Sequence, residues 1–337
     1  MALVTDAWYP QVNGVVTTLD KVREYAQKAG YEFHVIHPSL FSTVSAPKYP
    51  EIRLALCQKS KVHRALDKLS PDAVHIATEG PLGLDGRSWC RKRGKPFSTS
   101  YHTRFPEYIE MFFGVPAPLS YSYLKWFHRD SGGVLVPTKS VSEELVEKGF
   151  RNVKTWTRGV DGSLFIPRDE DKFELERPVW AYVGRVSVEK NLDEFLSLDL
   201  EGTKLVVGDG PYLGELKGKY PDAVFPGYMK GEQLAHYFAS ADVFVFPSVT
   251  DTFGVVMIEA MSCGVPVAAH PVPGPKDVVL HGKTGCLSFD LAEACREAIK
   301  CSPEACMEHA RSFTWENTAR MFIENLALPP GTVSRPA

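Results

Sequence analysis

Residues Pro247–His270 read PSVTDTFGVVMIEAMSCGVPVAAH, and this stretch decides the fold. The apolar run Val243–Phe246 leads into it, a polar turn follows, and a helical pattern runs from Phe253 to Ser262 before the apolar residues 265–269. Strand, loop, helix and strand in this order are typical of a parallel sheet in an α/β protein. The helix would begin with free backbone N–H groups, and such an N-terminus attracts phosphate.

The two carboxylates of this stretch, Asp251 and Glu259, are candidate ligands on either side of a diphosphate. Eight steps of helix rise span about 12 Å, which suits a nucleotide-sugar held by polar groups at its two ends. The backbone of Phe253, Gly254 and Val255 would cradle the diphosphate, because Gly254 has no side chain to obstruct an anion. The alternative is that Asp251 only caps the helix and Glu259 is a partly buried, paired acid.

The composition is that of a globular protein with more than one domain. The chain has 337 residues, of which 44% are hydrophobic and 23% charged, enough for two α/β domains of about 150 residues each. No run of 18 apolar residues predicts a transmembrane helix, and the N-terminus lacks a signal-peptide pattern. The seven cysteines form no C-x-x-C pair, so reduced thiols and a cytoplasmic location are expected.

Charge is distributed unevenly along the chain. Residues 1–160 hold 22 Lys+Arg against 15 Asp+Glu, a balance of +7, and the remainder holds 16 against 26, a balance of −10. The basic half is a candidate for contact with an anionic surface, and the basic, amphipathic residues 52–69 are predicted as a helix that lies either on a membrane or in solvent. We therefore expect peripheral attachment to the cytoplasmic face of a membrane, and no nucleic-acid partner.

The chain alternates strands with helices in both halves. In the first half the predicted helix after the opening strand spans residues 15–29, and the predicted strands span residues 3–5, 32–37, 73–77, 97–101, 133–136 and 153–156. In the second half, residues 179–183 and 205–207 continue the pattern. This alternation predicts doubly wound parallel sheets. No G-x-G-x-x-G follows the first strand, which argues against a nicotinamide-dinucleotide site.

Several polar residues follow predicted strand ends, where open α/β sheets bind ligands. Gly14 would let a phosphate or sugar approach the backbone, or it belongs to an ordinary turn. His102 follows another strand and is either structural or functional. In the second half, Arg185 and Lys190 are five residues apart, so a guanidinium and an ammonium could grip one diphosphate.

The stretch DTFGVVMIE followed by AMSCGVPV resembles the E-x7-E signature of family 4 glycosyltransferases, which are retaining enzymes with the GT-B fold. Asp251 stands where the first Glu is commonest. The D-T-F-G variant resembles the branch of GDP-mannose-dependent α-mannosyltransferases and glycosyltransferases that form glycolipids on diacylglycerol. The resemblance implies two Rossmann-like domains with an interdomain cleft: 1–160 for the acceptor, 161–312 for the nucleotide-sugar, a helix 313–328 crossing back to the first domain, and a tail 329–337.

The resemblance also implies roles for individual residues. Catalysis would involve His102 beside the transferred sugar, Arg185 and Lys190 on the phosphates, and Asp251 on the sugar hydroxyls. Because the string YHTRFPEY recurs in the lipid-glycosylating branch, the acceptor side is assigned to Glu79, Tyr101, Arg104 and Tyr108. The donor would be held by Gly14, by the backbone at Phe253, Gly254 and Val255, by Glu259 at the ribose, and near the base by Asp209, Gly210, Gly227 and Tyr228.

The activity implied is retaining transfer of a hexose, with mannose from GDP-mannose as the first candidate, to a membrane lipid or glycolipid. No cofactor and no metal are expected, because the formal D-x-D at Asp169-Glu170-Asp171 lies in a charge run without a preceding strand. The alternatives are UDP-glucose, UDP-glucuronate or UDP-sulfoquinovose as donor, and a soluble or polysaccharide acceptor. A GT-B sugar-nucleotide epimerase and a non-catalytic sugar-binding protein are rival classes.

Overall fold

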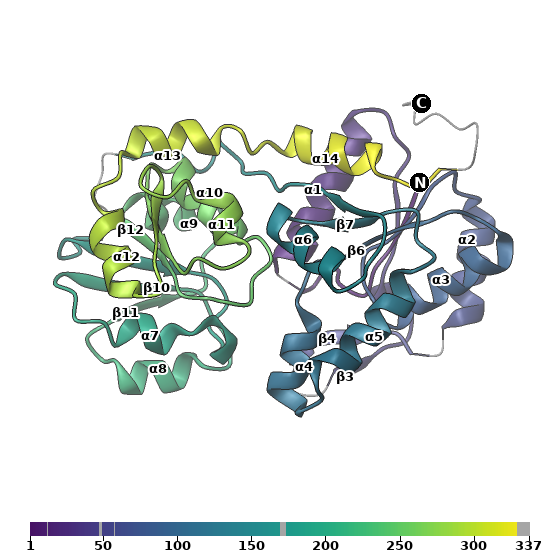
Figure 1. The fold of residues 1–337 in the computed structure, drawn as a ribbon, viewed down its shortest axis with the longest axis horizontal. Coiled ribbons are helices and arrows are strands. Elements are labelled where there is room, and N and C mark those ends of the chain that lie inside the picture. Colours follow the sequence, from purple (N-terminus) through teal and green to yellow (C-terminus); the bar gives the residue numbers. More distant parts are fainter. Residues whose placement is uncertain (12, 47–48, 57, 169–172, 329–337) are drawn as a thin grey trace. The chain divides into compact units, whose positions relative to one another are not determined.

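The computed structural model describes residues 1–11, 13–46, 49–56, 58–168 and 173–328. Within them the chain forms two compact units (Figure 1). Unit 1 contains Met1–Thr157 together with the segment that begins at Trp315, and unit 2 contains Arg158–Thr314. The first crossing between units therefore follows Thr157, where the sequence suggested residue 160. The D-x-D at 169–171 and the predicted tail 329–337 lie outside the described residues.

Unit 1 is built on a parallel sheet with the order β2-β1-β5-β6-β7-β8. Its strands are β1 (Ala2–Val4), β2 (His34–Ile36), β5 (Val74–Ile76), β6 (Ser98–Ser100), β7 (Val134–Val136) and β8 (Val153–Thr155). A separate antiparallel pair is formed by β3 (Val44–Ala46) and β4 (Tyr49–Leu54). Because β2 and β5 flank β1 on opposite sides, the strand order reverses between β1 and β5. The loops after these two strands therefore lie at the crevice position, where open α/β sheets bind ligands.

Helices cover both faces of the unit 1 sheet (Figure 1). They are α1 (Gly14–Lys28), η1 (Pro38–Leu40), α2 (Lys59–Leu69), α3 (Pro81–Arg93), α4 (Phe105–Phe113), α5 (Ala117–His128), α6 (Lys139–Glu147) and α14 (Trp315–Glu324). α1 buries Val16, Leu19, Val22 and Ala26, a spacing that keeps one helix face on the core. α14 packs against α1 and places Phe322 in the same core cluster.

Unit 2 has a parallel sheet with the order β11-β10-β9-β12-β13-β14. Its strands are β9 (Val179–Val183), β10 (Thr203–Val207), β11 (Val224–Gly227), β12 (Val243–Phe246), β13 (Val267–Ala269) and β14 (Gly285–Leu287). Its helices are η2 (Val188–Lys190), α7 (Leu192–Leu196), α8 (Leu213–Lys219), α9 (Gly231–Ala239), α10 (Val255–Ser262), α11 (Pro275–Val278), α12 (Leu291–Ala298) and α13 (Pro303–Ala310). Here the order reverses between β9 and β12.

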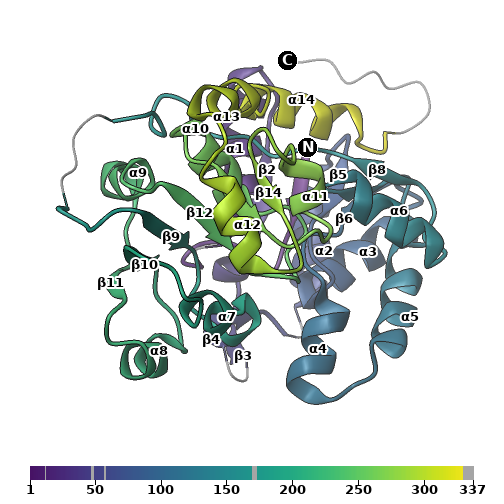
Figure 2. The ribbon, with the colours of Figure 1, turned by 60° about the vertical axis from the view of Figure 1, so that its left-hand side comes forward.

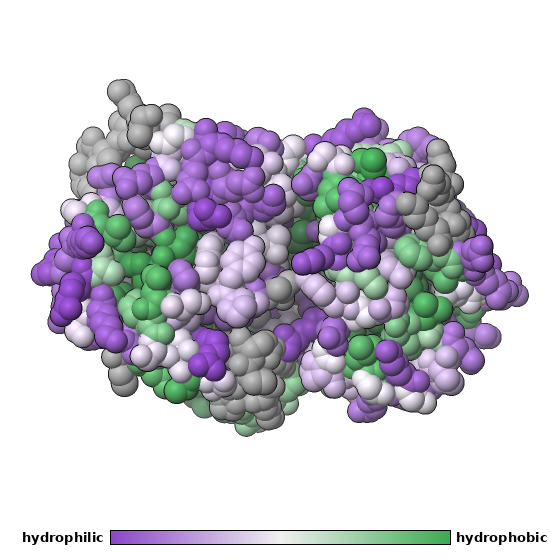
Figure 3. All heavy atoms as spheres, turned by 180° about the vertical axis from the view of Figure 1, so that it is seen from behind, coloured by the Kyte–Doolittle hydropathy of each residue, from purple (hydrophilic) through white to green (hydrophobic). Residues whose placement is uncertain are grey.

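Both faces of the unit 2 sheet are buried, as β9 shows most clearly. Val179 and Ala181 belong to the core cluster on one face, whereas Trp180 and Tyr182 belong to the cluster on the other. A strand alternates its side chains between the two faces, so a continuous apolar run is what a parallel sheet covered on both sides requires. On the surface seen from behind, hydrophilic side chains alternate with smaller hydrophobic patches (Figure 3).

The structure confirms the predicted α/β class with two parallel sheets, but it corrects the basic helix predicted at residues 52–69. Residues 49–54 form β4, and the helix α2 begins only at Lys59. The apolar face of α2 packs against α3, with Val62 and Leu66 fully buried, so that face is already occupied. No helix in the described part of the chain combines the length and apolar character that crossing a membrane requires.

Candidate active site

The predicted donor residues of unit 2 gather on loops at the carboxyl edge of its sheet. Arg185 and Lys190 follow β9, and Asp251 follows β12. These two strands are the neighbours between which the strand order reverses. Ligands of open α/β sheets bind at such a switch point, so fold and sequence motif indicate the same place.

Lys190 and Asp251 are joined to each other. The Lys190 ammonium donates hydrogen bonds to both carboxylate oxygens of Asp251 at 2.8 Å, and the two side chains are only 16% and 23% exposed. The sequence suggested one residue for the phosphates and the other for the sugar. The structure shows in addition that the Lys190 ammonium contacts the Asp251 carboxylate. This ion pair connects the loop after β9 to the loop after β12.

The start of α10 differs from the prediction. The helix begins at Val255 rather than Phe253, and its N-cap is Gly254, which adopts a left-handed conformation with φ of 81°. The Phe253 side chain is buried against Phe313, with ring centroids 6.0 Å apart, and this contact holds the preceding loop outside the helix. Asp251 therefore does not cap the helix, because no side chain accepts a hydrogen bond at the N-cap.

This helix start has the properties of an anion site. The N-cap residue Gly254 has no side chain to cap the first-turn N–H groups, which include that of Val255, and such groups carry the partial positive charge of a helix N-terminus. The glycine at 254 is needed for two reasons. Its left-handed backbone disfavours other residues, and a Cβ there would lie 2.8 Å from Met257 Cε and 3.0 Å from Phe246 Cζ.

The loops after β9 and β10 cross at backbone distance. A Cβ on Gly208 would lie 1.8 Å from the carbonyl oxygen of Gly184, and one on Gly210 would lie 2.2 Å from that of Val186. The Val186 N–H also donates to the carbonyl of Asp209 at 2.9 Å. These contacts hold Asp209 at the sheet edge with its side chain exposed. The sequence analysis singled out the turn that contains Gly208 and Gly210 but missed Gly184.

The remaining predicted donor residues of unit 2 are also at this edge or on the helix that follows it. Gly227 ends β11, and Tyr228 follows it with 53% of its surface exposed. Glu259 lies in the second turn of α10, half-buried, and forms no ion pair with any described residue. Loss of water around it raises the pKa of the Glu259 carboxyl to about 7, from an ordinary value near 4.5. Among the described residues Glu259 therefore has no cationic partner, and the alternative that it is a paired acid is excluded for this part of the chain.

A polar network that the sequence analysis missed supports the loops from behind. Glu194 accepts a hydrogen bond from the Asn191 side-chain amide, and its carboxylate lies 3.0 Å from Nε2 of the buried His270. The other ring nitrogen of His270 lies 3.1 Å from the carbonyl of Ser288. Because these residues follow β9, β13 and β14, the network fixes three loops relative to one another.

In unit 1, the crevice position is organised by a buried acid that the sequence analysis also missed. The Asp6 carboxylate accepts hydrogen bonds from the backbone N–H groups of Leu82 at 2.9 Å and Gly83 at 3.3 Å, and from the Thr78 hydroxyl at 2.8 Å. Asp6 thereby caps α3 from the neighbouring strand. Burial raises the pKa of Asp6 against the lowering effect of these bonds.

Gly14 occupies the first turn of α1, which Asn13 caps. The Asn13 side-chain oxygen accepts from the N–H groups of Val15 and Val16 at 3.0 Å. Gly14 is exposed, and a Cβ there would meet no heavy atom within 4 Å. The protein itself therefore does not require glycine at 14, which leaves an approaching ligand as a reason for it.

Two of the predicted acceptor-side residues are buried instead of facing solvent. Tyr101 is 1% exposed and lies in a core cluster with Tyr121, and burial raises the pKa of its hydroxyl. The Glu79 carboxylate is 8% exposed and lies 3.3 Å from Nε2 of His128. In these positions both residues support the loops after β5 and β6 rather than present a surface to an acceptor.

The other three predicted residues follow β6. The half-buried His102 ring lies edge-on to Trp156, 5.9 Å between centroids. Arg104 forms an ion pair with Glu144 of α6. Tyr108 is half-buried on α4.

Comparison with known proteins places both units in known families. Residues 12–164 match the family model described as Glycosyltransferase Family 4, and residues 177–301 match that described as Glycosyl transferases group 1. The GDP-mannose-dependent alpha-mannosyltransferase of Mycobacterium tuberculosis is 32% identical over 314 residues, with 85% of this chain and 83% of the relative covered. The chain belongs to glycosyltransferase family 4.

The names of other relatives of this glycosyltransferase indicate the transfer of different sugars. The sulfoquinovosyl transferase of Arabidopsis thaliana is 31% identical, covering 81% of this chain and 56% of the relative. The alpha-monoglucosyldiacylglycerol synthase of Streptococcus pneumoniae is 27% identical, covering 90% and 79%.

Solved structures confirm the GT-B fold of the glycosyltransferase. Sucrose-phosphate synthase from Thermosynechococcus elongatus matches with a TM-score of 0.77 at 20% identity, covering 95% of this chain and 96% of that one. The Anabaena protein HepE, in complex with UDP and glucose, matches with a TM-score of 0.72 at 17% identity, covering 96% and 98%. Among the described residues of the glycosyltransferase, no group of three or more His, Cys, Asp or Glu side chains is arranged to hold a metal ion.

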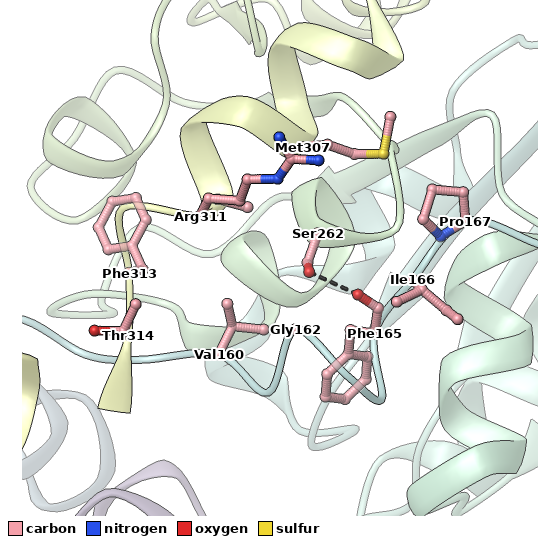
Figure 4. Close-up of a pocket in the computed structure, with 11 residues that line it drawn as sticks. Val160, Gly162, Phe165, Ile166, Pro167, Ser262, Met307, Arg311, Phe313 and Thr314 are labelled. Atoms are coloured by element: carbon pink, nitrogen blue, oxygen red, sulfur yellow. Dashed lines mark hydrogen bonds between the residues drawn. The ribbon is translucent and has the colours of Figure 1, made fainter. Parts of the chain in front are cut away.

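Unit 2 of the glycosyltransferase also has a pocket of about 280 Å³ that none of the predicted site residues lines (Figure 4). It lies between α10, α13 and the segment after the first crossing between units. Ser262 donates a hydrogen bond of 2.6 Å to the carbonyl of Phe165, and Arg311 extends above it (Figure 4). This pocket is therefore distinct from the switch-point loops.

Proposed function

We propose that this glycosyltransferase moves a hexose, with retention of anomeric configuration, from a nucleoside-diphosphate sugar to a membrane lipid or glycolipid. Mannose from GDP-mannose is the first candidate. The observation that carries the proposal is that the Lys190–Asp251 ion pair and the glycine-capped start of α10 lie together at the switch point of unit 2. Cations and helix N–H groups stabilise the charge that develops on a leaving diphosphate.

The ion pair suggests separate roles for Lys190 and Asp251 in binding the donor. Lys190 and Arg185 would bind the diphosphate, and Asp251 would accept hydrogen bonds from sugar hydroxyls while its charge is balanced by Lys190. A carboxylate whose two oxygens both contact one ammonium is a weak nucleophile. This supports same-face substitution, in which the acceptor attacks from the side of the leaving group and no protein nucleophile is needed.

The remaining assignments follow the positions of the residues. We assign Glu259 to the ribose and the loops at Asp209, Gly210, Gly227 and Tyr228 to the base. The exposed Gly14 is assigned to the donor, His102 to the sugar, and Arg104 and Tyr108 to the acceptor. Glu79 and Tyr101 become supporting residues because they are buried.

The choice of donor and acceptor rests on the relatives. Relatives at 30–32% identity include GDP-mannose-dependent mannosyltransferases, and those that act on diacylglycerol support a lipid acceptor. A UDP-sugar-dependent diacylglycerol glycosyltransferase is the second candidate, favoured by the sulfoquinovosyl and glucosyl relatives.

Calorimetric binding of GDP, UDP and ADP without added metal tests the proposal. We expect GDP to bind selectively, and GDP-mannose to be consumed only when a lipid acceptor is present. Lys190→Ala should weaken the binding of GDP, and Lys283→Ala, at an exposed lysine, should not. Selective UDP binding would replace the first candidate by the second. If none of the three nucleotides binds, the donor site is misassigned.

A further inference from the structure

An exposed apolar patch lies at the turn between α4 and α5 of unit 1, at the end of these helices away from the sheet in both views (Figures 1 and 2). Met111 and Phe113 end α4, Val115 lies in the turn, and Leu119 is in the first turn of α5. Their exposed fractions are 52%, 56%, 38% and 63%. Single exposed apolar residues are ordinary, but four at one turn form a patch. We call these four residues the tip patch.

The apolar surface continues along α5. Leu119, Tyr123 and Trp126 are spaced at i, i+4 and i+7, which places them on one face of the helix. Tyr123 and Trp126 are each 39% exposed, and their rings lie 5.8 Å apart. The opposite face of α5 packs into the unit, with Leu124 and Phe127 buried. The exposed face therefore presents apolar surface to solvent, while the Tyr123 hydroxyl donates a hydrogen bond of 2.7 Å to the carbonyl of Glu79.

A basic groove begins where this face ends. Trp126 lines a surface pocket of about 570 Å³ together with Lys59 of α2 and Arg91 and Lys92 of α3. All three cations are exposed, and Asp85 is the carboxylate that lines the same pocket. We call these three cations the basic groove.

Trp126 is held rigidly at the junction of the two surfaces. The buried Arg87 guanidinium lies 4.3 Å from the centre of the Trp126 ring. The same guanidinium donates to the Trp126 carbonyl at 3.0 Å and to the Asp130 carboxylate at 2.6 Å. A tryptophan fixed between apolar and cationic surface has the amphipathic environment that its ring prefers at a membrane interface.

We infer that unit 1 docks on an anionic lipid bilayer through the tip patch and the basic groove. Along this surface the tip patch would contact the hydrocarbon of the bilayer, Tyr123 and Trp126 would lie at its interface, and the cations of the basic groove would contact lipid phosphates. The charge of the groove selects an anionic bilayer over an uncharged apolar partner. The inference rests on the proposed lipid acceptor and names the surface through which the enzyme would reach it.

The helix α2, which the sequence favoured for this task, fits less well. Its buried Val62 and Leu66 leave no apolar face to insert, so its outward lysines could contribute only charge. This difference supplies a matched control within the same unit.

Sedimentation of the full chain with vesicles tests the inference. Vesicles of phosphatidylcholine alone are compared with vesicles in which roughly one third of the lipid is phosphatidylglycerol, at low and high salt. We expect binding only to the anionic vesicles, and weaker binding at high salt. Arg91→Glu/Lys92→Glu should weaken binding by about tenfold or more, because each basic residue near an anionic bilayer contributes about a fivefold attraction. Phe113→Ser/Leu119→Ser should also weaken binding, by about tenfold or more, because it removes two apolar side chains that would be buried in the bilayer.

Two control variants make the comparison specific. Lys61→Glu/Lys68→Glu reverses the same number of charges on α2, and Val146→Ser removes an exposed apolar residue of α6; both should bind vesicles nearly as the wild type does. GDP binding should be unchanged in all four variants, which separates this inference from the proposed donor site. The inference is overturned if the wild type does not bind anionic vesicles, or if the α2 variant loses binding as much as the groove variant does.

Discussion

The buried position of Glu259 predicts an unusual effect of pH on the stability of unit 2. The pKa of this carboxyl is raised from near 4.5 to about 7 by loss of water. Well below pH 4.5 this carboxyl is protonated in both folded and unfolded chains, so it does not change the free energy of unfolding there. As pH rises from 4.5 to 7, the unfolded chain loses the proton first, so the wild type loses stability. The full difference corresponds to at most about 3 kcal/mol, since a tenfold change in proton affinity is 1.36 kcal/mol.

We therefore predict that Glu259→Gln stabilises unit 2 at pH 8 and has little effect at pH 4.5. The measurement is urea unfolding of the full chain at a series of pH values, followed by hydrogen exchange of peptides from β12 and α10. Residual solvent at the half-buried carboxylate will make the gain smaller than 3 kcal/mol. Glu308→Gln, at an exposed carboxylate of α13, is the matched control and should show no such trend. A difference between wild type and Glu259→Gln that is the same at pH 4.5 and pH 8 would refute the reasoning.

Three further predictions concern the site and its supports. Lys190→Ala should lower kcat by about a hundredfold or more. In a double-mutant cycle, Asp251→Asn should lower kcat much less in the Lys190→Ala variant than in the wild type. If the two losses in initial rate are additive, the two residues act independently. Gly14→Ala should leave the melting temperature unchanged or raise it, because the helix has room for a methyl group, yet lower kcat/KM for the donor; unaltered kinetics would remove residue 14 from the donor site. Asp6→Ala should destabilise unit 1 by about 1–2 kcal/mol through loss of the α3 cap without changing the calorimetric affinity for GDP, and a loss of that affinity would contradict a purely structural role.

The sequence was sufficient to predict the layer architecture and to predict that Arg185, Lys190 and Asp251 follow strands at one edge of a sheet. A short apolar run such as Val243–Phe246, followed by a polar turn, is typical of a strand buried on both faces, and helical patterns between such strands favour parallel order. The polar residues that follow such strands then share one edge. The ion pair of Lys190 with Asp251 was not predictable, because it depends on which loops the strand order makes neighbours.

Residues whose role depends on distant packing were the ones that sequence reasoning misjudged. Tyr101 follows a strand in the position of a site residue, but its ring fills the space against Tyr121. The apolar residues of α2 have the spacing of a membrane helix and are instead covered by α3. Asp6 had no local partner to reveal it, because the N–H groups that it accepts lie more than seventy residues away. Burial by a remote segment leaves no trace in local pattern.

The assignment of α14 to unit 1 has a consequence for how the protein is made. Phe322 and Ile323 of this helix complete the core around Leu3 and Leu19, although they leave the ribosome only after the whole of unit 2. Unit 2, being continuous from Arg158 to Thr314, can finish folding during synthesis, whereas the unit begun first must wait with an uncovered stripe on α1. A stop codon near residue 314 would thus spare unit 2 and damage unit 1, most of which is translated before it.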